Sequence, residues 1–148
     1  MLRKATEDDF LDLIAFRSGA CGCTRTVAAD WIKNVIGFEN ILILEKTAPD
    51  GSRTFAAMLA AVPVRLGYRH GVWLSGLATR KDLCGKGLMT KLLETCFRAY
   101  AQSGCDFAVA IPEGERTAAW LKTLAFTPAF PRRRVMREIQ RNLLAQAY

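Results

Sequence analysis

The chain has 148 residues, 51% of them hydrophobic, which is enough to close one sizeable core but not two. Its formal charge of +7 is scattered along the sequence and Arg132–Arg134 is the one true basic run, so a nucleic acid is disfavoured as a partner. The longest apolar run, residues 55–64, is too short to cross a membrane, and the start lacks a signal peptide's apolar core. We expect a single domain over residues 1–140, a tail at 141–148, and no membrane partner.

The cysteines predict a reducing compartment, the cytoplasm. Their number is odd, and none has the paired spacing of a metal site. A single histidine, His70, is too few to complete a tetrahedral site with them, so we expect no metal. The cysteines are Cys21, Cys23, Cys84, Cys96 and Cys105.

The first third of the chain predicts two strands and two helices. Leu2 to Ala5 is a short strand, and Thr6-x-x-Asp9 is typical of the cap of a helix. A second helix ends near Gly37, and a strand follows from Asn40 to Glu45. Helical spacing is carried by Phe10, Leu13, Ile14 and Arg17 in the first helix and by Val27, Trp31, Val35 and Ile36 in the second.

Two central antiparallel strands follow a turn at Pro49–Gly51. The first, Thr54 to Val64, is apolar on both faces, and a turn at Gly67–Gly71 leads into the second, Val72 to Ala78. Gly76 lies inside the second strand. It indicates a bulge, a close approach of a ligand, or a simply tolerated strand glycine.

A Gly-rich turn, Cys84-Gly-Lys-Gly-Leu-Met89, opens a helix that runs from Gly87 to about Gln102. Such a turn directs unpaired backbone N–H groups and the positive helix end to one point, where phosphate binds. A Walker loop is excluded because Arg80 occupies the position of its first glycine. A dinucleotide fold would need a third glycine where Thr90 stands.

The last part of the chain predicts a strand, a helix and one or two further strands. The strand is Asp106 to Ile111, broken by Pro112–Gly114, and the helix is Glu115 to Leu124. Phe126 to Ile139 supplies the remaining strands.

The segment Gly76 to Met89 resembles the acyl-CoA-binding motif of the GNAT superfamily of N-acyltransferases. Phe107–Pro112 is similar to the next strand of that fold, and Ala119–Phe126 to its aromatic-Tyr-x-x-x-Gly-Phe segment. The resemblance covers roughly residues 72–126. It implies an α/β (α+β) fold with a mixed, mostly antiparallel sheet of six to seven strands. About four helices would cover its faces, and the sheet would splay at a parallel strand pair.

The resemblance also implies an activity, which is direct transfer of acetyl from acetyl-CoA to a primary amine of a small molecule or peptide. The strand around Gly76 would hold the pantetheine and the thioester carbonyl, through the backbone of Leu77, Ala78 and Thr79. The pyrophosphate would bind to Cys84, Gly85, Lys86, Gly87, Leu88, Met89 and Thr90. Arg80 and Lys81, together with Lys86, would attract the phosphates.

The sequence departs from the family pattern at four positions: Cys84 replaces Gln or Arg, Met89 a small residue, Leu121 the usual Tyr, and Ala125 the usual Gly. Leucine cannot protonate the leaving thiolate.

The reaction also needs a base that accepts the proton of the amine. Glu113, just beyond a strand end, is the preferred candidate, and Glu115 and Glu45 are alternatives. Glutamates at 113 and 115 are equally typical of a helix start. His70 sits in a turn that places it at the wrong end of the sheet.

Three alternatives stay open. The first is a GNAT-like CoA-binding sensor or interaction domain that has lost catalysis. The others are a basic nucleic-acid-binding module and a nucleotide-binding oxidoreductase. Sheet-edge pairing into a homodimer is compatible with the pattern.

Overall fold

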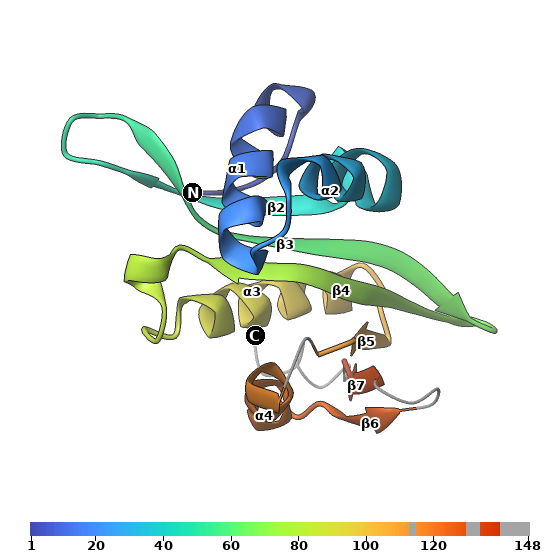
Figure 1. Cartoon of the computed structure of the whole chain (residues 1–148). Coiled ribbons are helices and arrows are strands. Elements are labelled where there is room, and N and C mark those ends of the chain that lie inside the picture. Colours follow the sequence, from blue (N-terminus) through green and yellow to red (C-terminus); the bar gives the residue numbers. More distant parts are fainter. Residues whose placement is uncertain (113–114, 130–133, 140–148) are drawn as a thin grey trace. The chain divides into compact units, whose positions relative to one another are not determined.

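The structure, a computed structural model, describes residues 1–112, 115–129 and 134–139 (Figure 1). In these residues seven strands form one mixed sheet, in the order β1-β2-β3-β4-β5-β7-β6, and β4 and β5 run parallel. The strands are β1 (Leu2–Lys4), β2 (Ile41–Thr47), β3 (Arg53–Leu66), β4 (Arg69–Thr79), β5 (Phe107–Ala110), β6 (Thr127–Ala129) and β7 (Arg134–Glu138). The predicted α/β class and the mostly antiparallel sheet are confirmed.

Four α-helices accompany the sheet in the described residues: α1 (Phe10–Cys21), α2 (Arg25–Asp30), α3 (Leu88–Gln102) and α4 (Glu115–Thr123). Shorter helical segments are η1 (Glu7–Asp9), η2 (Trp31–Ile36), η3 (Phe38–Asn40) and η4 (Lys81–Leu83), of which η2 is a π-helix. No helix in the described part of the chain is long and apolar enough to span a membrane. The expectations for Glu113, for Arg132 and Arg133 and for residues 141–148 lie outside the described residues.

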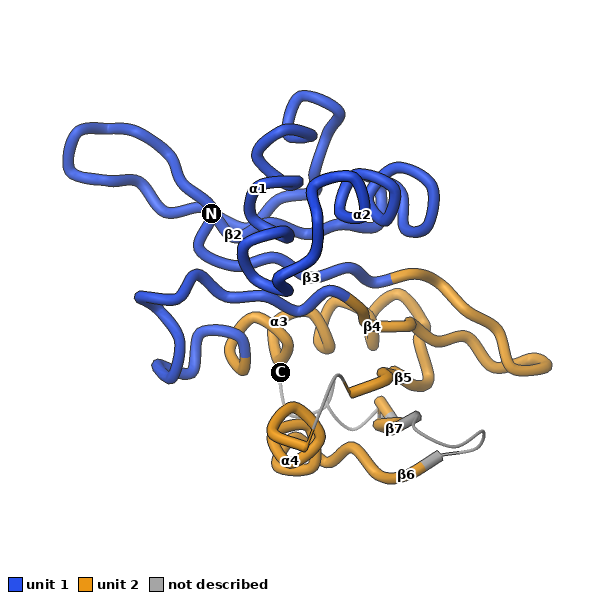
Figure 2. The backbone as a smooth tube through the Cα atoms, in the orientation of Figure 1, with its two compact units in different colours: residues 1–61, 76–89 blue, residues 62–75, 90–148 orange. Residues whose placement is uncertain are grey.

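The chain divides into two compact units, residues 1–61 with 76–89 and residues 62–75 with 90–148 (Figure 2). In the first unit, α1 and α2 lie along β2 and the first half of β3 (Figure 1). Five consecutive residues of β3, 56–60, are fully buried, which confirms a strand that is apolar on both faces. The helices complete this core with Leu13, Ile14, Ala28, Ile32 and Ile36.

The predicted apolar stripe of the second helix is wrong at two positions. Val27 and Val35 are 57% and 54% exposed, while Ala28 and Ile32 are buried together with the predicted Ile36. The buried residues are four apart, as Val27, Trp31 and Val35 are, so the buried face is displaced by one position along the chain. The segment η2 ends at Gly37, which donates its N–H to the carbonyl of Ile32 five residues earlier.

A charged cluster fastens the start of the first unit. The amide of Thr6 donates to Asp9 Oδ2 at 2.8 Å, as the predicted cap requires. Arg3 donates to both Asp9 oxygens, at 2.7 and 2.8 Å, and to Glu45 Oε1 at 2.6 Å. The Arg3 guanidinium holds the pKa values of Asp9 and Glu45 below their usual range. Glu45 lies where β2 shifts register against β3.

The second unit packs α3 and α4 with the β4 start, β5, β6 and β7. The buried face of α3 is formed by Leu92, Leu93, Cys96 and Phe97. Arg137 on β7 donates to Glu94 on α3 at 2.8 Å and lies over the Phe97 ring. Helix α3 is thereby tied to the sheet of this unit.

The parallel pairing of β4 with β5 is short. It runs from Gly71 opposite Phe107 to Leu74 opposite Ala110, so four residue pairs make up the ladder. Strand β4 continues beyond its last pair to Thr79. The residues of the predicted thioester contact, Leu77–Thr79, therefore follow the end of the ladder.

Candidate active site

The turn that opens α3 has the geometry of an anion cradle. Gly85 and Gly87 both have left-handed backbone, with φ of +77° and +74°. A Cβ on either glycine would meet no atom within 4 Å, so the space beside the turn is open. These glycines are needed for the shape of the backbone, because their surroundings would leave room for a side chain.

Backbone donors in this turn are left without a partner. Within the described residues, the amides from Gly85 to Thr90 donate to no other group of the protein, and α3 has no acidic residue in its first turn. The positive end of the helix is therefore not neutralised within that turn. This arrangement suits a phosphate.

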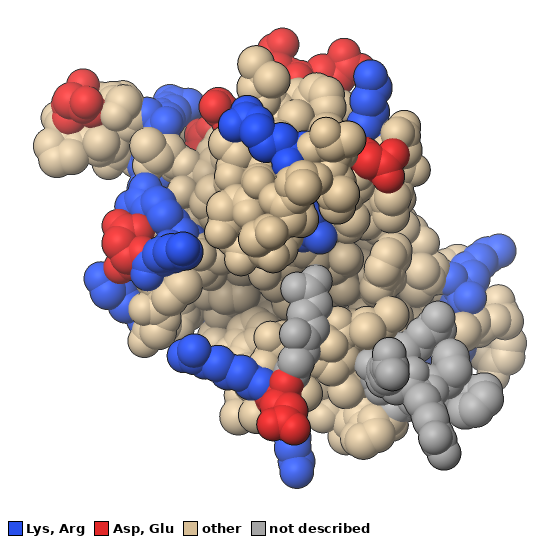
Figure 3. All heavy atoms as spheres, viewed as in Figure 1, with Lys and Arg blue, Asp and Glu red and all other residues tan. Residues whose placement is uncertain are grey.

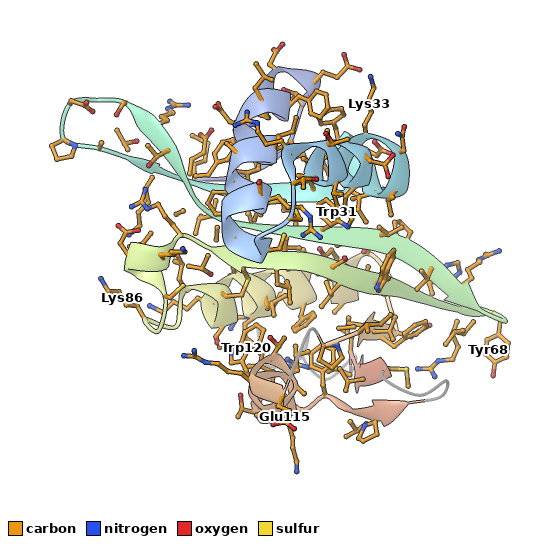
Figure 4. All side chains as sticks on the ribbon, viewed as in Figure 1. Trp31, Lys33, Tyr68, Lys86, Glu115 and Trp120 are labelled. Carbon is orange, nitrogen blue, oxygen red and sulfur yellow. The ribbon has the colours of Figure 1, made fainter. Side chains whose placement is uncertain are left out.

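The basic residues beside the turn differ in their availability. Arg80 donates to Asp82 Oδ1 at 2.6 Å and to the Thr54 hydroxyl at 2.8 Å, so its guanidinium is engaged within the protein. Lys81 and Lys86 are exposed. Figure 4 shows Lys86 projecting away from the ribbon, and Figure 3 shows Lys and Arg gathered around one acidic group at this turn. The lysines are the cations that remain available for phosphates.

Three predicted contact residues of the cradle have side chains that contact other parts of the protein. Cys84 is exposed, yet its thiol lies 3.6 Å from the carbonyl oxygens of both Thr79 and Arg80. Met89 is half-buried at the α3 start, and Thr90 accepts the indole N–H of Trp120 at 3.1 Å. Figure 4 shows Trp120 directed from α4 toward α3. The start of α3 is thus braced while its amides stay available.

Gly76 lies inside strand β4 and has left-handed backbone, with φ of +60°. A Cβ there would lie 2.4 Å from the Trp31 ring and 2.9 Å from Arg17 Nη1, so no larger residue fits. The Arg17 guanidinium stacks on Trp31, 3.6 Å from the ring centroid. The left-handed φ, rather than this packing, favours the bulge among the explanations considered for Gly76.

Sequence reasoning did not place Arg17 or Trp31 in the site. Both were assigned to the apolar spacing of their helices, and nothing in the sequence shows that they meet at β4. The available signals were an arginine at an apolar position and a glycine inside a strand. In the folded unit, Arg17 places a cation beside β4, the strand that leads into the cradle.

No family model matches the sequence, and no curated protein matches it in sequence. Solved structures do resemble it. "AtaTR bound with AcCoA" matches with a TM-score of 0.73 at 17% identity, over 98% of this chain and 97% of that chain. The NatC complex bound to Gag peptide and CoA gives 0.71 at 12% identity, over 95% and 98%.

A GCN5-related N-acetyltransferase from Anabaena variabilis matches with a TM-score of 0.64 at 15% identity over 81% of this chain, which spans 30% of that longer chain. The chain has the GNAT fold. The resemblance of residues 72–126 to GNAT enzymes is thus confirmed at the level of fold, and the chemistry of this chain rests on its own residues.

Position 121, where the GNAT pattern has a tyrosine, holds no side chain that could protonate the leaving thiolate. Leu121 is fully buried in the second unit. The neighbouring Trp120 is half-buried, and its N–H is already donated to Thr90. An indole N–H does not release a proton at neutral pH. Neither residue can protonate a leaving thiolate.

The candidates for a base are spread over the fold. Glu45 is held by Arg3, which leaves it poorly suited to accept a proton. Glu115 begins α4 and is exposed, pointing outward in Figure 4. His70 lies at the start of β4, at the opposite end of that strand from Thr79. Glu113, the preferred candidate, lies outside the described residues.

Proposed function

We propose that this chain is an acyl-CoA-dependent N-acyltransferase, which transfers acetyl from acetyl-CoA to a primary amine of a small molecule or peptide. The observation that carries the proposal is the turn before α3. It has two left-handed glycines, and its backbone amides have no acceptor among the described residues. The GNAT fold supports it, as do neighbours solved with AcCoA or CoA. The pyrophosphate would bind to Cys84, Gly85, Lys86, Gly87, Leu88, Met89 and Thr90.

In this proposal the backbone of Leu77, Ala78 and Thr79 fixes the pantetheine and polarises the thioester carbonyl. The amine nitrogen attacks the carbonyl carbon, the carbon–sulfur bond breaks, and an amide and the CoA thiolate result. The amine proton passes through water to a carboxylate, for which we retain Glu113. Because position 121 is a buried leucine, water protonates the thiolate.

The proposal extends to the setting of the enzyme. We assign residues 1–140 to one acyltransferase domain and 141–148 to a tail. The odd set of five cysteines supports a reducing cytoplasmic location, and acetyl-CoA serves as the acyl donor without a metal.

The alternative is a GNAT-fold domain that binds CoA without catalysis. The buried Leu121 favours it, because the fold keeps the cradle while the usual proton donor is missing. Turnover separates the two functions, since both bind CoA and only the enzyme releases free CoA thiol when an amine is supplied.

Calorimetric titration with acetyl-CoA in moderate salt tests the cradle. We expect saturable binding near one equivalent, and its loss in Gly87→Glu, which places an anion in the open space. Gly51→Glu is the matched control, because Gly51 also has left-handed backbone (φ +86°) with open surroundings but lies in the β2–β3 turn. Equal loss of binding in both variants, or no binding by the wild type, contradicts the proposal.

Release of CoA thiol with a panel of amines then tests catalysis. Glu113→Gln is expected to lower kcat while leaving the calorimetric affinity for acetyl-CoA unchanged. Glu115→Gln, on the exposed start of α4, is the control and should retain activity. Binding without turnover of any amine supports the non-catalytic alternative.

A further inference from the structure

Arg17 is a half-buried cation that lacks a polar partner. Its Nε is buried without a hydrogen-bond partner, and among the described residues no carboxylate pairs with its guanidinium. Arg3 in the same unit shows the usual arrangement, with Asp9 and Glu45 both bound to it. Leaving the Nε–H unpaired while it is shielded from water is costly, so this arginine favours a hydrogen-bond acceptor supplied by a ligand.

The stacking on Trp31 limits the direction from which a hydrogen-bond acceptor can reach the guanidinium. One face of the guanidinium lies on the indole, 3.6 Å from its centroid, which leaves the edge with its N–H groups for hydrogen bonding. This edge matches the paired oxygens of a carboxylate or phosphate. Figure 4 shows Trp31 beside the sheet, and a Cβ at Gly76 on β4 would lie 2.4 Å from its ring, so the indole packs against that strand.

The position along β4 links this cation to the reaction. Arg17 Nη1 would lie 2.9 Å from a Cβ at Gly76, and Leu77–Thr79, the proposed thioester contacts, follow directly. At about 3.3 Å per strand residue, Leu77 lies roughly 3 Å and Thr79 roughly 10 Å beyond the Gly76 position that the guanidinium borders. An oxyanion and an amine on one compact molecule can bridge such a distance.

We propose that Arg17, supported by Trp31, binds an oxyanion carried by the acceptor close to its amine, a carboxylate or a phosphate. This inference rests on the proposed acyltransferase function and names the substrate class of its site. Cationic and neutral amines are then poor acceptors, since they leave the Arg17 N–H groups unpaired.

An NMR titration of the full chain tests the oxyanion site without relying on activity. The Nε–H resonance of Arg17, assigned by its loss in Arg17→Lys, is followed as sodium acetate or inorganic phosphate is added. We expect a saturable shift, with the stronger response identifying carboxylate or phosphate as the source. No shift with either anion, or an equal shift of the exposed Arg98 on α3, overturns the inference.

Acceptor kinetics provide the second readout, using glycine against glycinamide and phosphoethanolamine against ethanolamine. In Arg17→Gln we expect KM for the anionic member to rise about tenfold or more with little change in kcat, since a charge-assisted hydrogen bond is lost. Arg17→Lys should recover part of the loss, and Arg98→Gln should match the wild type.

The two proposals fail in different ways. Wild-type protein that does not bind acetyl-CoA in calorimetry refutes the acyltransferase, whatever Arg17 does. Protein that binds acetyl-CoA and acetylates neutral and anionic amines equally refutes the oxyanion site alone. If none of the four acceptors is turned over, the NMR titration decides.

Discussion

Gly76 on β4 and the glycines of the α3 turn share left-handed backbone but differ in their surroundings. Gly76 is pressed against Trp31 and Arg17, whereas Gly85 and Gly87 face open space. At Gly76 the absent side chain makes room for the protein itself. At the turn it leaves room beside a row of free amides, which is where a ligand is expected. The same residue type thus marks packing in one region and the proposed binding site in the other.

Gly76→Ala should produce the largest effect. We expect the free energy of unfolding to fall by about 2–6 kcal/mol, from about 1–3 for backbone strain and about 1–3 for overpacking against Trp31. Denaturant unfolding measures it. Two controls separate the causes, because Gly51→Ala adds only strain and Gly71→Ala adds only crowding, against Phe107 at 2.5 Å. A loss no larger than that of Gly51→Ala would break the comparison.

Arg3→Gln sharpens the contrast between a paired and an unpaired arginine. Removing hydrogen bonds to Asp9 and Glu45 should cost about 2–3 kcal/mol at pH 7. Both carboxyl pKa values are lowered in the folded protein, so their stabilisation is complete above the unfolded value of about 4 and is lost as pH falls through the folded values.

Unfolding measured from pH 7 to pH 2 checks this pH dependence. The difference between wild type and Arg3→Gln should shrink below about pH 4, the unfolded carboxyl pKa. Arg98→Gln, on an exposed part of α3, should follow the wild type throughout. A difference that stays constant in acid would show that Arg3 acts by packing alone.

Gly87→Ala tests the turn before α3, where the glycines face open space. Strain without crowding should lower the free energy of unfolding by about 1–2 kcal/mol. The affinity for acetyl-CoA should fall about tenfold or more, near 1.4 kcal/mol, because the methyl group enters the space proposed for pyrophosphate. Calorimetry alongside Gly51→Ala makes the test, and equal affinities in the two variants would contradict it.

Ala125→Gly should have the smallest effect, and a stabilising one. Ala125 follows α4 with φ of +66°, the one left-handed non-glycine among the described residues. Relief of about 1–2 kcal/mol of strain, less the entropy of glycine, should raise the free energy of unfolding by about 0.5–1 kcal/mol. Ala119→Gly, on the exposed face of α4, should instead destabilise. Destabilisation in both would refute this reading of Ala125.

Local signals were sufficient for most of the fold. The Thr6 and Asp9 pair predicts a helix start because capping depends on residues three apart, and the amide bond to Asp9 is present. Gly85 and Gly87 predict a tight turn for similarly local reasons, and both are left-handed. The GNAT resemblance added the parallel pair β4 and β5, which no local pattern specifies.

Long-range packing explains what the sequence could not show. Arg17, Trp31 and Gly76 meet only after the helices dock on β4, so no short pattern relates them. Val27 and Val35 were misplaced because apolar residues stand at two adjacent sets of helical positions, and only docking on the sheet decides which set is buried. The role of Glu45 depended on Arg3, which is distant in sequence.

The short β4–β5 ladder has a further consequence for the ligand-free protein. Past Leu74, the β4 edge that faced β5 has no further β5 residue opposite it in the described chain. Such an edge is a template for another strand. In the proposed acyltransferase the amide groups of pantetheine would hydrogen-bond along this edge, so acetyl-CoA would take the place of a further strand. Amide hydrogens at Leu77–Thr79 should then exchange with solvent more slowly once the cofactor is bound, and the loaded protein should resist self-association.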